Sequence, residues 1–314
     1  MRFSSALITG ASGLVGRALT RYLCDQGIDV TVSGRQSSDL PQGLRAIRVD
    51  AVHADEIRDA LRGTSFDVVF HCAAYGVSPA DRDTEMLRRV NVEATAAWLK
   101  AAADAGSRAF VNVGSCFEYG STTDGIPIEE DHPLASTELY GASKIAGAVW
   151  AQALAKEAGI AFQWVRLFGV YGPEEKPHRL IPYLHERLRR SERVSLTPGL
   201  QVRDVLFIDD VAVGLAMIAD LALVGKTGPF NLCSGIPITI RDVAIEVARQ
   251  TGTSMDLLDF GARDYRPGEP MWLVGSAAKL RAASGFAPSV SIREGIAKTI
   301  QILDRDAVVR QPNA

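Results

Sequence analysis

A glycine-rich turn near the start of the chain limits the possible folds more than any other feature. The apolar run at residues 6–9 leads into Gly10-Ala-Ser-Gly13-Leu-Val-Gly16, and apolar residues then recur at helical spacing. Glycines let the backbone approach a pyrophosphate closely, and a helix N-terminus favours its negative charge. The order strand, tight turn and helix therefore predicts a dinucleotide-binding site. The spacing is G-x-x-G-x-x-G rather than G-x-G-x-x-G, and the alternative is that these glycines serve only turn geometry and helix packing.

Short apolar runs alternate with helix-length segments through the first half of the chain. The expected strands are residues 6–9, 29–33, 46–49, 68–71, 109–113 and 162–167. This alternation predicts an α/β fold: a Rossmann-type, doubly wound parallel sheet with helices on both faces. Ligands should bind at the carboxyl ends of its strands.

The pattern changes after Tyr171, where prolines and arginines become more frequent. Two further strands, at residues 205–208 and 229–232, flank a helix at 209–223 and indicate a return to the main sheet. We therefore predict two domains, a dinucleotide-binding domain and a smaller α/β substrate-binding domain. The first comprises residues 1–168 and 205–236, and the second comprises residues 169–204 and 237–314.

The composition argues against several classes of function. The 314 residues are 47% hydrophobic and 23% charged, and a net charge of -3 without like-charge blocks indicates neither a nucleic-acid-binding face nor a membrane surface. The N-terminus runs directly into a strand, without the regions of a secretory signal, and no apolar run approaches the ~20 residues of a membrane span. The four cysteines and five histidines are scattered, so we expect a cytoplasmic protein without a metal site.

The end of the second predicted strand bears on the choice of nicotinamide cofactor. An acidic residue there would bind the ribose 2′-hydroxyl of NAD, whereas a nearby arginine accommodates the 2′-phosphate of NADP. This strand ends at Gly34 and Arg35, while Asp29 lies at its other end. We therefore favour NADP(H) over NAD(H), although Arg35 could equally be a solvated loop arginine.

Tyr140 and Lys144 carry the candidate chemistry. In a helix predicted over residues 140–158, their i,i+4 spacing places the phenol and the ammonium group on one face. The cation can then favour the phenolate and lower the pKa of Tyr140, because an isolated phenol titrates near ~10, too high for efficient proton exchange at neutral pH. The alternative is a solvated helix-surface pair. The glycine turn and Ser115 upstream favour the catalytic interpretation.

These motifs resemble the extended short-chain dehydrogenase/reductase family, in particular its nucleotide-sugar epimerase, dehydratase and reductase branch. The resemblance covers nearly the whole chain. In order, it rests on the glycine turn, Val49-Asp50-Ala51, His71-Cys-Ala-Ala74, Asn91, Ser115-Cys-Phe-Glu-Tyr119-Gly120, Tyr140-x3-Lys144 and Tyr171-Gly-Pro173. It implies that the cofactor is bound by Gly10, Ser12, Gly13, Leu14, Val15, Gly16, Arg35, Asp50, Ala51, Cys72, Ala73, Ala74, Tyr140, Lys144 and Val170.

The resemblance also implies roles at the reacting atoms. Tyr140 would act as the acid/base, Lys144 would hold the nicotinamide ribose, and Ser115 would hydrogen-bond the reacting oxygen. Hydride transfer to a carbonyl carbon builds negative charge on that oxygen, which a positioned donor must stabilise. Cys116 and Phe117 would line the substrate site beside Ser115.

Three arginines are candidates for binding a substrate diphosphate. Arg203, in Gln201-Val-Arg203-Asp204, and Arg266, in Arg266-Pro-Gly-Glu269, resemble family segments whose guanidinium groups grip phosphate oxygens. Arg179 falls where relatives often carry an asparagine near the same phosphates. The alternative for each is a surface arginine or an intramolecular salt bridge.

One departure from the family pattern limits the reactions that we expect this protein to catalyse. Cys116 and Phe117 stand where 4,6-dehydratases place an Asp-Glu pair, so elimination of water lacks its acid and base. Cys116 has no histidine near it in sequence and is interpreted as a small packed residue instead of a nucleophile. A reductase must exchange its cofactor and draws on NADPH, so Arg35 favours a 4-ketoreductase acting on a nucleotide-linked 4-keto-6-deoxyhexose. The alternatives are a C4 epimerase with tightly bound NAD and a non-catalytic NAD(P)-sensing protein.

A homodimer is expected by analogy with the family. The helices near residues 85–104 and 140–158 have alanine-rich faces that allow close packing. These faces carry Ala94, Ala97, Ala101, Ala148, Ala151 and Ala155. The same spacing also suits packing of both helices onto the sheet of their own chain.

Overall fold

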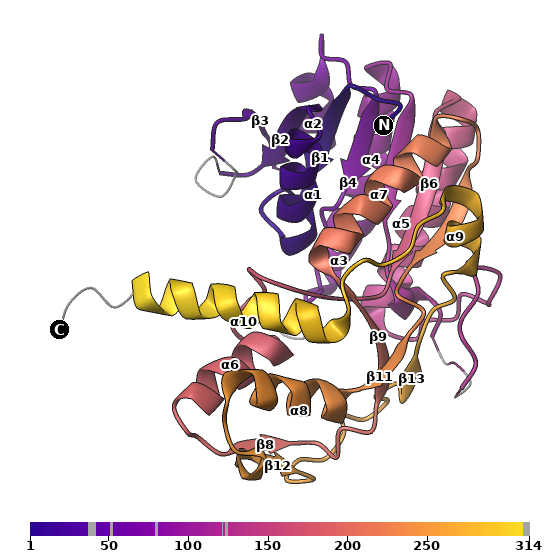
Figure 1. Cartoon of the computed structure of the whole chain (residues 1–314). Helices are drawn as coiled ribbons and strands as arrows, with labels where there is room; N and C mark the ends of the chain where they lie inside the picture. The colour runs from indigo at the N-terminus through magenta and orange to yellow at the C-terminus, as the bar shows by residue number, and fades with distance from the viewer. Residues whose placement is uncertain (37–41, 51–52, 79–80, 121, 123–124, 310–314) are drawn as a thin grey trace.

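A seven-stranded parallel sheet forms the centre of the molecule. The computed structural model describes residues 1–36, 42–50, 53–78, 81–120, 122 and 125–309. The strand order is β10-β6-β5-β4-β1-β2-β3 (Figure 1). The strands are β1 (Ser5–Thr9), β2 (Asp29–Gly34), β3 (Arg45–Arg48), β4 (Val68–His71), β5 (Ala109–Val113), β6 (Ala161–Leu167) and β10 (Gly228–Leu232). The Rossmann-type fold class expected from the sequence is confirmed.

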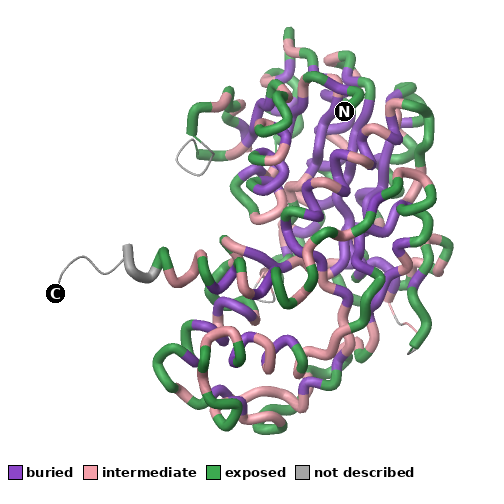
Figure 2. The backbone as a smooth tube through the Cα atoms, viewed as in Figure 1, coloured by how far each residue is buried: buried purple, intermediate pink, exposed green. Residues whose placement is uncertain are grey.

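Both faces of this sheet are covered, because neighbouring residues of a strand point to opposite sides. In β1, Ala6 and Ile8 belong to the apolar core on one face and Leu7 belongs to the core on the other. All three side chains are inaccessible to solvent, and Figure 2 shows the central strands as a continuous buried layer. Burial on both faces is what an all-parallel sheet requires.

Helices from distant parts of the chain provide the two covering layers. On one face, α1 (Leu14–Asp25) packs against α7 (Ile208–Ala222), and both contribute to the larger core. On the other face lie α2 (Ala54–Leu61), α4 (Ala94–Asp104) and α5 (Leu139–Ala158). The short helix α3 (Thr84–Arg88) and a π-helical turn, η2 (Arg89–Glu93), lead into α4.

Most of the remaining elements lie at the end of the sheet drawn lowest in Figure 1, whereas α9 (Ala278–Ser284) lies beside the main sheet, where it packs on α7 and β10. A second sheet contains β7 (Gly169–Tyr171), β9 (Val202–Phe207), β11 (Pro237–Thr239) and β13 (Trp272–Leu273). A third sheet pairs β8 (Val194–Leu196) with β12 (Leu258–Phe260). The later helices are α6 (Leu180–Arg189), α8 (Ile240–Thr251), α9 (Ala278–Ser284) and α10 (Ile292–Val309). Every helix in the described ranges is too short or too polar to span a lipid bilayer.

The strands expected from the sequence form with small shifts. Each of the first six has its ends within one residue of the expected position, and the helix predicted at 140–158 is α5. Of the two later strands, β10 joins the main sheet beside β6, but β9 pairs with β7, β11 and β13 in the second sheet. The division of the chain into two domains stays a prediction.

The alanine-rich faces of α4 and α5 are used inside the chain. Ala94, Ala101, Ala148, Ala151 and Ala155 are buried and belong to one apolar core. Because α4 packs directly on α5, small side chains allow their backbones to approach each other. The alanine spacing therefore reflects packing within the protomer.

Candidate active site

The glycine turn between β1 and α1 is tightly packed. Gly10 has φ +67, and a Cβ atom there would lie 2.6 Å from the backbone nitrogen of Ala73. A Cβ at Gly16 would lie 2.3 Å from the carbonyl oxygen of Gly10. Real Cβ atoms do not approach backbone atoms so closely, so both positions require glycine. The turn therefore lies directly against the segment that follows β4.

The N-terminus of α1 is suited to a phosphate group. Gly13 is its N-cap residue, and within the described residues no side chain caps this end and no acidic residue stands in the first turn. Ser12 and Gly13 are exposed, while Leu14 and Val15 are half-buried. Backbone N–H groups and the helix dipole thus remain available for a pyrophosphate. The residues present fit a dinucleotide at this place.

The segment after β4 is positioned by a buried histidine. His71 is inaccessible, its Nδ1 lies 2.8 Å from the Thr9 hydroxyl, and its Nε2 lies 3.1 Å from the Thr95 hydroxyl. Burial, assisted by the charge of Lys144, lowers the pKa of His71 to about 3, so the ring is neutral. His71 therefore has a structural role. Cys72 and Ala73 are half-buried against the glycine turn, and Ala74 is exposed.

The other predicted cofactor residues lie at or near strand ends. Arg35 is exposed immediately after β2, and Val170 is half-buried within β7. Asp50 is half-buried after β3, and its backbone N–H donates to Glu56 over 3.4 Å. Ala51 lies outside the described residues. Arg35 is thus accessible to a cofactor phosphate.

Ser115 and Tyr140 meet although they come from different elements. Ser115 is buried as the N-cap of a 3-10 turn, η3 (Cys116–Glu118), which follows β5. Tyr140 lies in the first turn of α5, where its phenol is hydrogen-bonded by the Ser115 side chain. Lys144, one turn later, is only 2% exposed. The structure therefore brings the predicted catalytic residues to one place.

The pKa values differ from the expectation for Tyr140. Burial raises the pKa of Tyr140, and the hydrogen bond from Ser115 opposes that rise only in part. Burial also lowers the pKa of Lys144, against the opposing effects of Glu118 and Cys72. The predicted lowering of the Tyr140 pKa is thus wrong for the protein alone, because desolvation of the phenolate outweighs the hydrogen bond from Ser115. Tyr140 is a phenol at neutral pH and can donate a proton.

Asn91 fixes the start of α5. It is buried in the π-helical turn η2, and its side chain accepts the Tyr75 N–H and donates to the Tyr75 carbonyl, each over 2.9 Å. It also donates to the Ser143 hydroxyl over 2.9 Å, and Ser143 donates to the Tyr140 carbonyl over 2.7 Å. This chain of bonds holds the first turn of α5 and thereby the backbone of Tyr140.

The two residues after Ser115 present no acid or base. Cys116 is buried, and burial raises the pKa of its thiol to about 12. Phe117 is 38% exposed, and its ring meets the Tyr140 ring edge-on with 6.4 Å between centroids. The packed interpretation of Cys116 therefore agrees with its surroundings, and the side of the site beside Tyr140 is aromatic.

The three candidate substrate arginines have different surroundings. Arg203 is 16% exposed and forms an ion pair of 2.6 Å with Glu269. Arg266 is exposed in the loop that carries Glu269. Arg179 precedes α6, and its Nε lies 3.5 Å from Glu175, whose pKa burial raises to about 7. Arg203 and Arg179 are thus both engaged in ion pairs, and the charge of Arg203 also acts on the Cys116 thiol.

Sequence reasoning missed a buried ion pair behind Ser115. Glu118 is fully buried; one carboxylate oxygen accepts the Ser115 N–H over 2.8 Å, and the other lies 3.5 Å from the Arg166 Nε. The Ser-x-x-Glu spacing of a capping box could have identified the first contact. No local pattern identifies Arg166, because it comes from β6.

Comparison with known proteins gives the family. Residues 6–233 match the family described as "NAD dependent epimerase/dehydratase family". The chain belongs to this family. It is therefore an enzyme of the extended short-chain dehydrogenase/reductase type, in the nucleotide-sugar branch, as the sequence motifs indicated.

Individual relatives of this epimerase/dehydratase family cover almost the whole chain. A dTDP-glucose 4,6-dehydratase of Streptomyces griseus is 29% identical, over 94% of this chain and 92% of its own length. A UDP-glucose 4-epimerase of Mycolicibacterium smegmatis is 28% identical, over 94% of this chain and 97% of its own. The structure of a Thermus thermophilus UDP-glucose 4-epimerase complexed with NAD has a TM-score of 0.85 and 27% identity, covering 96% of this chain and 99% of that one.

Proposed function

We propose that this protein is an NADPH-dependent 4-ketoreductase acting on a nucleotide-linked 4-keto-6-deoxyhexose. The observation that carries the proposal is the pair after Ser115, a buried thiol at Cys116 and an aromatic ring at Phe117. These stand where the dehydratases that the chain resembles place an acid and a base. With neither group a proton donor or acceptor at neutral pH, elimination of water has no catalyst. Hydride transfer beside Tyr140 without elimination is therefore the reaction that these residues can support.

The proton donors of the site suit the reduction of a carbonyl group. A bound nicotinamide cofactor supplies the hydride. The half-buried Tyr140 phenol is the proton donor for the oxygen on which negative charge develops, and the Ser115 hydroxyl is its hydrogen-bond partner. Lys144 is buried one helical turn after Tyr140, where its ammonium form would stabilise the anion that develops on the reacting oxygen.

The cofactor preference rests on Arg35. It is exposed just after β2, and among the described residues no carboxylate stands at that end of the strand. A guanidinium group there can bind the 2′-phosphate of NADPH, and it offers no acceptor for the 2′-hydroxyl of NAD. An enzyme that exchanges NADPH on each turnover consumes a reductant, which is the behaviour of a reductase.

Phe117 supports a 6-deoxy sugar as the substrate. Its ring is partly exposed and lies edge-on against the Tyr140 ring, so the wall of the site next to the proton donor is apolar. A C6 methyl group gains free energy by covering such a surface, whereas a C6 hydroxyl would lose hydrogen bonds to water. For the diphosphate of the substrate we propose Arg203 and Arg266.

The test is NADPH oxidation, followed by absorbance, with a panel of sugar nucleotides. Oxidation only in the presence of a 4-keto-6-deoxy sugar nucleotide is the expected result. Tyr140→Phe should abolish it, whereas Tyr183→Phe, a control on the remote helix α6, should retain it. Unchanged turnover in Tyr140→Phe would show that Tyr140 is not the acid.

The alternative is a C4 epimerase with tightly bound NAD, which the relatives favour because a similar structure holds NAD. An epimerase uses the same Ser115, Tyr140 and Lys144 set but returns the hydride to the sugar. NAD that co-purifies with the protein, together with interconversion of two sugar nucleotides without net redox, would establish it. A sensing protein without turnover would retain its function in Tyr140→Phe.

A homodimer through α5 is also proposed, but on a different face from the one expected. Opposite the buried alanines, α5 exposes an apolar stripe of Leu139, Ala142, Ala146, Val149 and Trp150. Trp150 is 58% exposed, and a second copy could cover it through a two-fold axis. Sedimentation should show a dimer that Trp150→Glu converts to a monomer, and a monomeric wild-type protein at micromolar concentration would rule the dimer out.

A further inference from the structure

A carboxylate lies behind the proposed catalytic serine, on the side away from solvent. The Glu118 side chain is inaccessible, and its Oε1 accepts the Ser115 N–H over 2.8 Å. Its Oε2 lies 3.5 Å from the Arg166 Nε. The Ser115 N–H donates to Oε1, whereas Oε2 forms an ion pair with Arg166 and has no hydrogen bond among the described residues. An amide at this position would leave the buried guanidinium group without its counter-charge.

The backbone around this carboxylate is shaped to admit it. A Cβ atom at Gly114 would lie 2.4 Å from the Glu118 Oε1 and 3.0 Å from the Trp164 Nε1. Gly114 therefore leaves the space that Glu118 occupies. The carboxylate also forms half of a capping box with Ser115, whose hydroxyl accepts the Phe117 N–H over 3.2 Å. The same turn thus holds both the backbone N–H and the hydroxyl group of Ser115.

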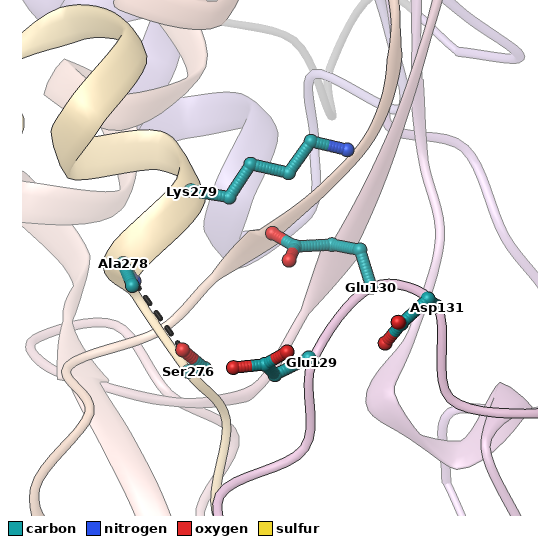
Figure 3. A pocket seen from close by; sticks show the side chains of 6 residues that line it. All are labelled: Glu129, Glu130, Asp131, Ser276, Ala278 and Lys279. Atoms are coloured by element: carbon teal, nitrogen blue, oxygen red, sulfur yellow. Dashed lines mark hydrogen bonds between the residues drawn. The ribbon is translucent and has the colours of Figure 1, made fainter.

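A buried network continues from Glu118 towards the surface. Arg166 donates to the Tyr119 hydroxyl over 3.0 Å and to the Glu130 carbonyl over 2.8 Å. The Glu130 side chain accepts the Asn231 N–H over 2.8 Å. Glu130 also lines a surface pocket together with Lys279, in which none of the predicted catalytic side chains takes part (Figure 3). Only the inner end of the network therefore touches the serine.

We propose that Glu118 is a positioning residue for the reaction: ionised, it holds Ser115 in register with Tyr140 and stabilises the ammonium charge of Lys144. The first effect follows from the hydrogen bond that the Ser115 N–H donates to Glu118 and from the hydrogen bond between the Ser115 side chain and Tyr140. The second follows from the electrostatic contact between Glu118 and Lys144, two buried charges in a medium of low dielectric constant. This inference rests on the proposed function, because Glu118 would position the same groups that carry out the proposed reaction.

The ionisation of Glu118 should be visible near neutral pH. Burial raises the pKa of Glu118 to about 7, while the Ser115 N–H, Lys144 and Arg166 oppose the rise. The titratable groups facing it are Tyr140 and Lys144 on α5, Arg166 on β6 and Cys116 in its own turn. Of these, the thiol and the phenol are neutral at pH 7, because burial raises the pKa of each. Loss of the Glu118 charge is therefore the change expected as pH falls through 7.

The test compares two isosteric substitutions in one network. Glu118→Gln removes the charge next to Ser115, and Glu130→Gln removes a charge from the outer end, away from Ser115 and Lys144. In turnover with the sugar substrate, Glu118→Gln should lower kcat by about tenfold at pH 8, with the sugar KM changed less than about twofold. The acidic limb of the wild-type kcat profile near pH 7 should disappear in Glu118→Gln and persist in Glu130→Gln.

Two results would overturn the proposal: an acidic limb that Glu118→Gln retains, or equal losses of kcat in the two variants. A merely structural role would reduce both variants through stability without moving the pH profile. If Glu118→Gln folds poorly, Glu118→Gln/Arg166→Met replaces the buried pair together and removes one of the two donors facing the amide. That double variant should fold and still lack the acidic limb.

A second readout needs no substrate. A carboxyl whose pKa rises from 4.5 in the unfolded chain to about 7 in the folded protein binds its proton more tightly when folded. Its contribution to stability is thus present below pH 4.5 and is lost as pH rises to 7. Glu118→Gln should flatten this decline relative to wild type. A decline of unchanged slope would defeat the inference about Glu118, even if the enzyme turned over as proposed. Absence of turnover together with a flattened decline would instead defeat only the proposed function.

Discussion

Replacement of Gly10 by alanine tests the tight approach of the cofactor turn to β4. Two costs combine at this position. The backbone has φ +67, and a Cβ atom would meet the Ala73 nitrogen at 2.6 Å and the Cys72 carbonyl carbon at 2.8 Å. Because both atoms belong to backbone, no rotamer change can relieve the contact.

Gly27 is a matched control that separates these costs. It has φ +76, and a Cβ atom there would have no atom within 4 Å. Gly27→Ala should therefore cost only the left-handed backbone strain, about 1 kcal/mol. Gly10→Ala adds overpacking of roughly 1–3 kcal/mol, for a total of about 2–4 kcal/mol. The difference between the variants measures the close approach alone.

Thermal unfolding and cofactor titration provide the assay. Gly10→Ala should lower Tm by several degrees more than Gly27→Ala. It should also weaken binding of NADPH, measured by fluorescence, because the turn can no longer lie against the segment after β4. Gly27→Ala should bind NADPH as the wild type does. Equal Tm values in the two variants, or unchanged NADPH affinity in Gly10→Ala, would refute the steric argument.

Three further substitutions examine the cofactor choice and the site wall. Arg35→Ala should raise the KM for NADPH by about 10-fold to 100-fold, because it removes a charge-assisted hydrogen bond, and should leave the KM for NADH unchanged. Equal effects on both cofactors would contradict a contact between Arg35 and the 2′-phosphate. Cys116→Ser should retain turnover. Iodoacetamide at pH 8 should inactivate the wild type slowly, because burial raises the pKa of the Cys116 thiol to about 12. Rapid inactivation that Cys116→Ser prevents would argue for a reactive thiol. Phe117→Ser should raise the KM for a 6-deoxy sugar nucleotide by about tenfold without affecting NADPH affinity, and an unchanged sugar KM would remove Phe117 from the substrate wall.

Features encoded by neighbouring residues could be read from the sequence. The glycine turn, the strands of the first half and the helix carrying Tyr140 and Lys144 depend on local spacing, and the structure contains all of them. The position of β9 could not be read in this way. Its partners β7, β11 and β13 include strands far away along the chain, and short strands with similar residues fit either sheet.

The electrostatics of the site depended on tertiary packing. The i,i+4 spacing placed Lys144 near Tyr140 but could not reveal that burial would raise the phenol pKa. Glu118 was visible in sequence as the fourth residue of Ser-x-x-Glu, yet its partner Arg166 comes from another strand. Likewise, Arg203 was recognisable as a candidate phosphate ligand, but its ion pair with Glu269 requires the folded loop.

The destination of the hydride tests the central claim most directly. The protein would be incubated with NADPH deuterated at C4 of the nicotinamide, on the face it transfers, and with a 4-keto-6-deoxy sugar nucleotide. The product would then be analysed by mass spectrometry and NMR. The proposed reaction predicts one deuterium at C4 of the sugar for each NADPH oxidised, and no such product with Tyr140→Phe. Sugar nucleotides that interconvert without deuterium and without loss of NADPH would contradict the reductase and establish an epimerase.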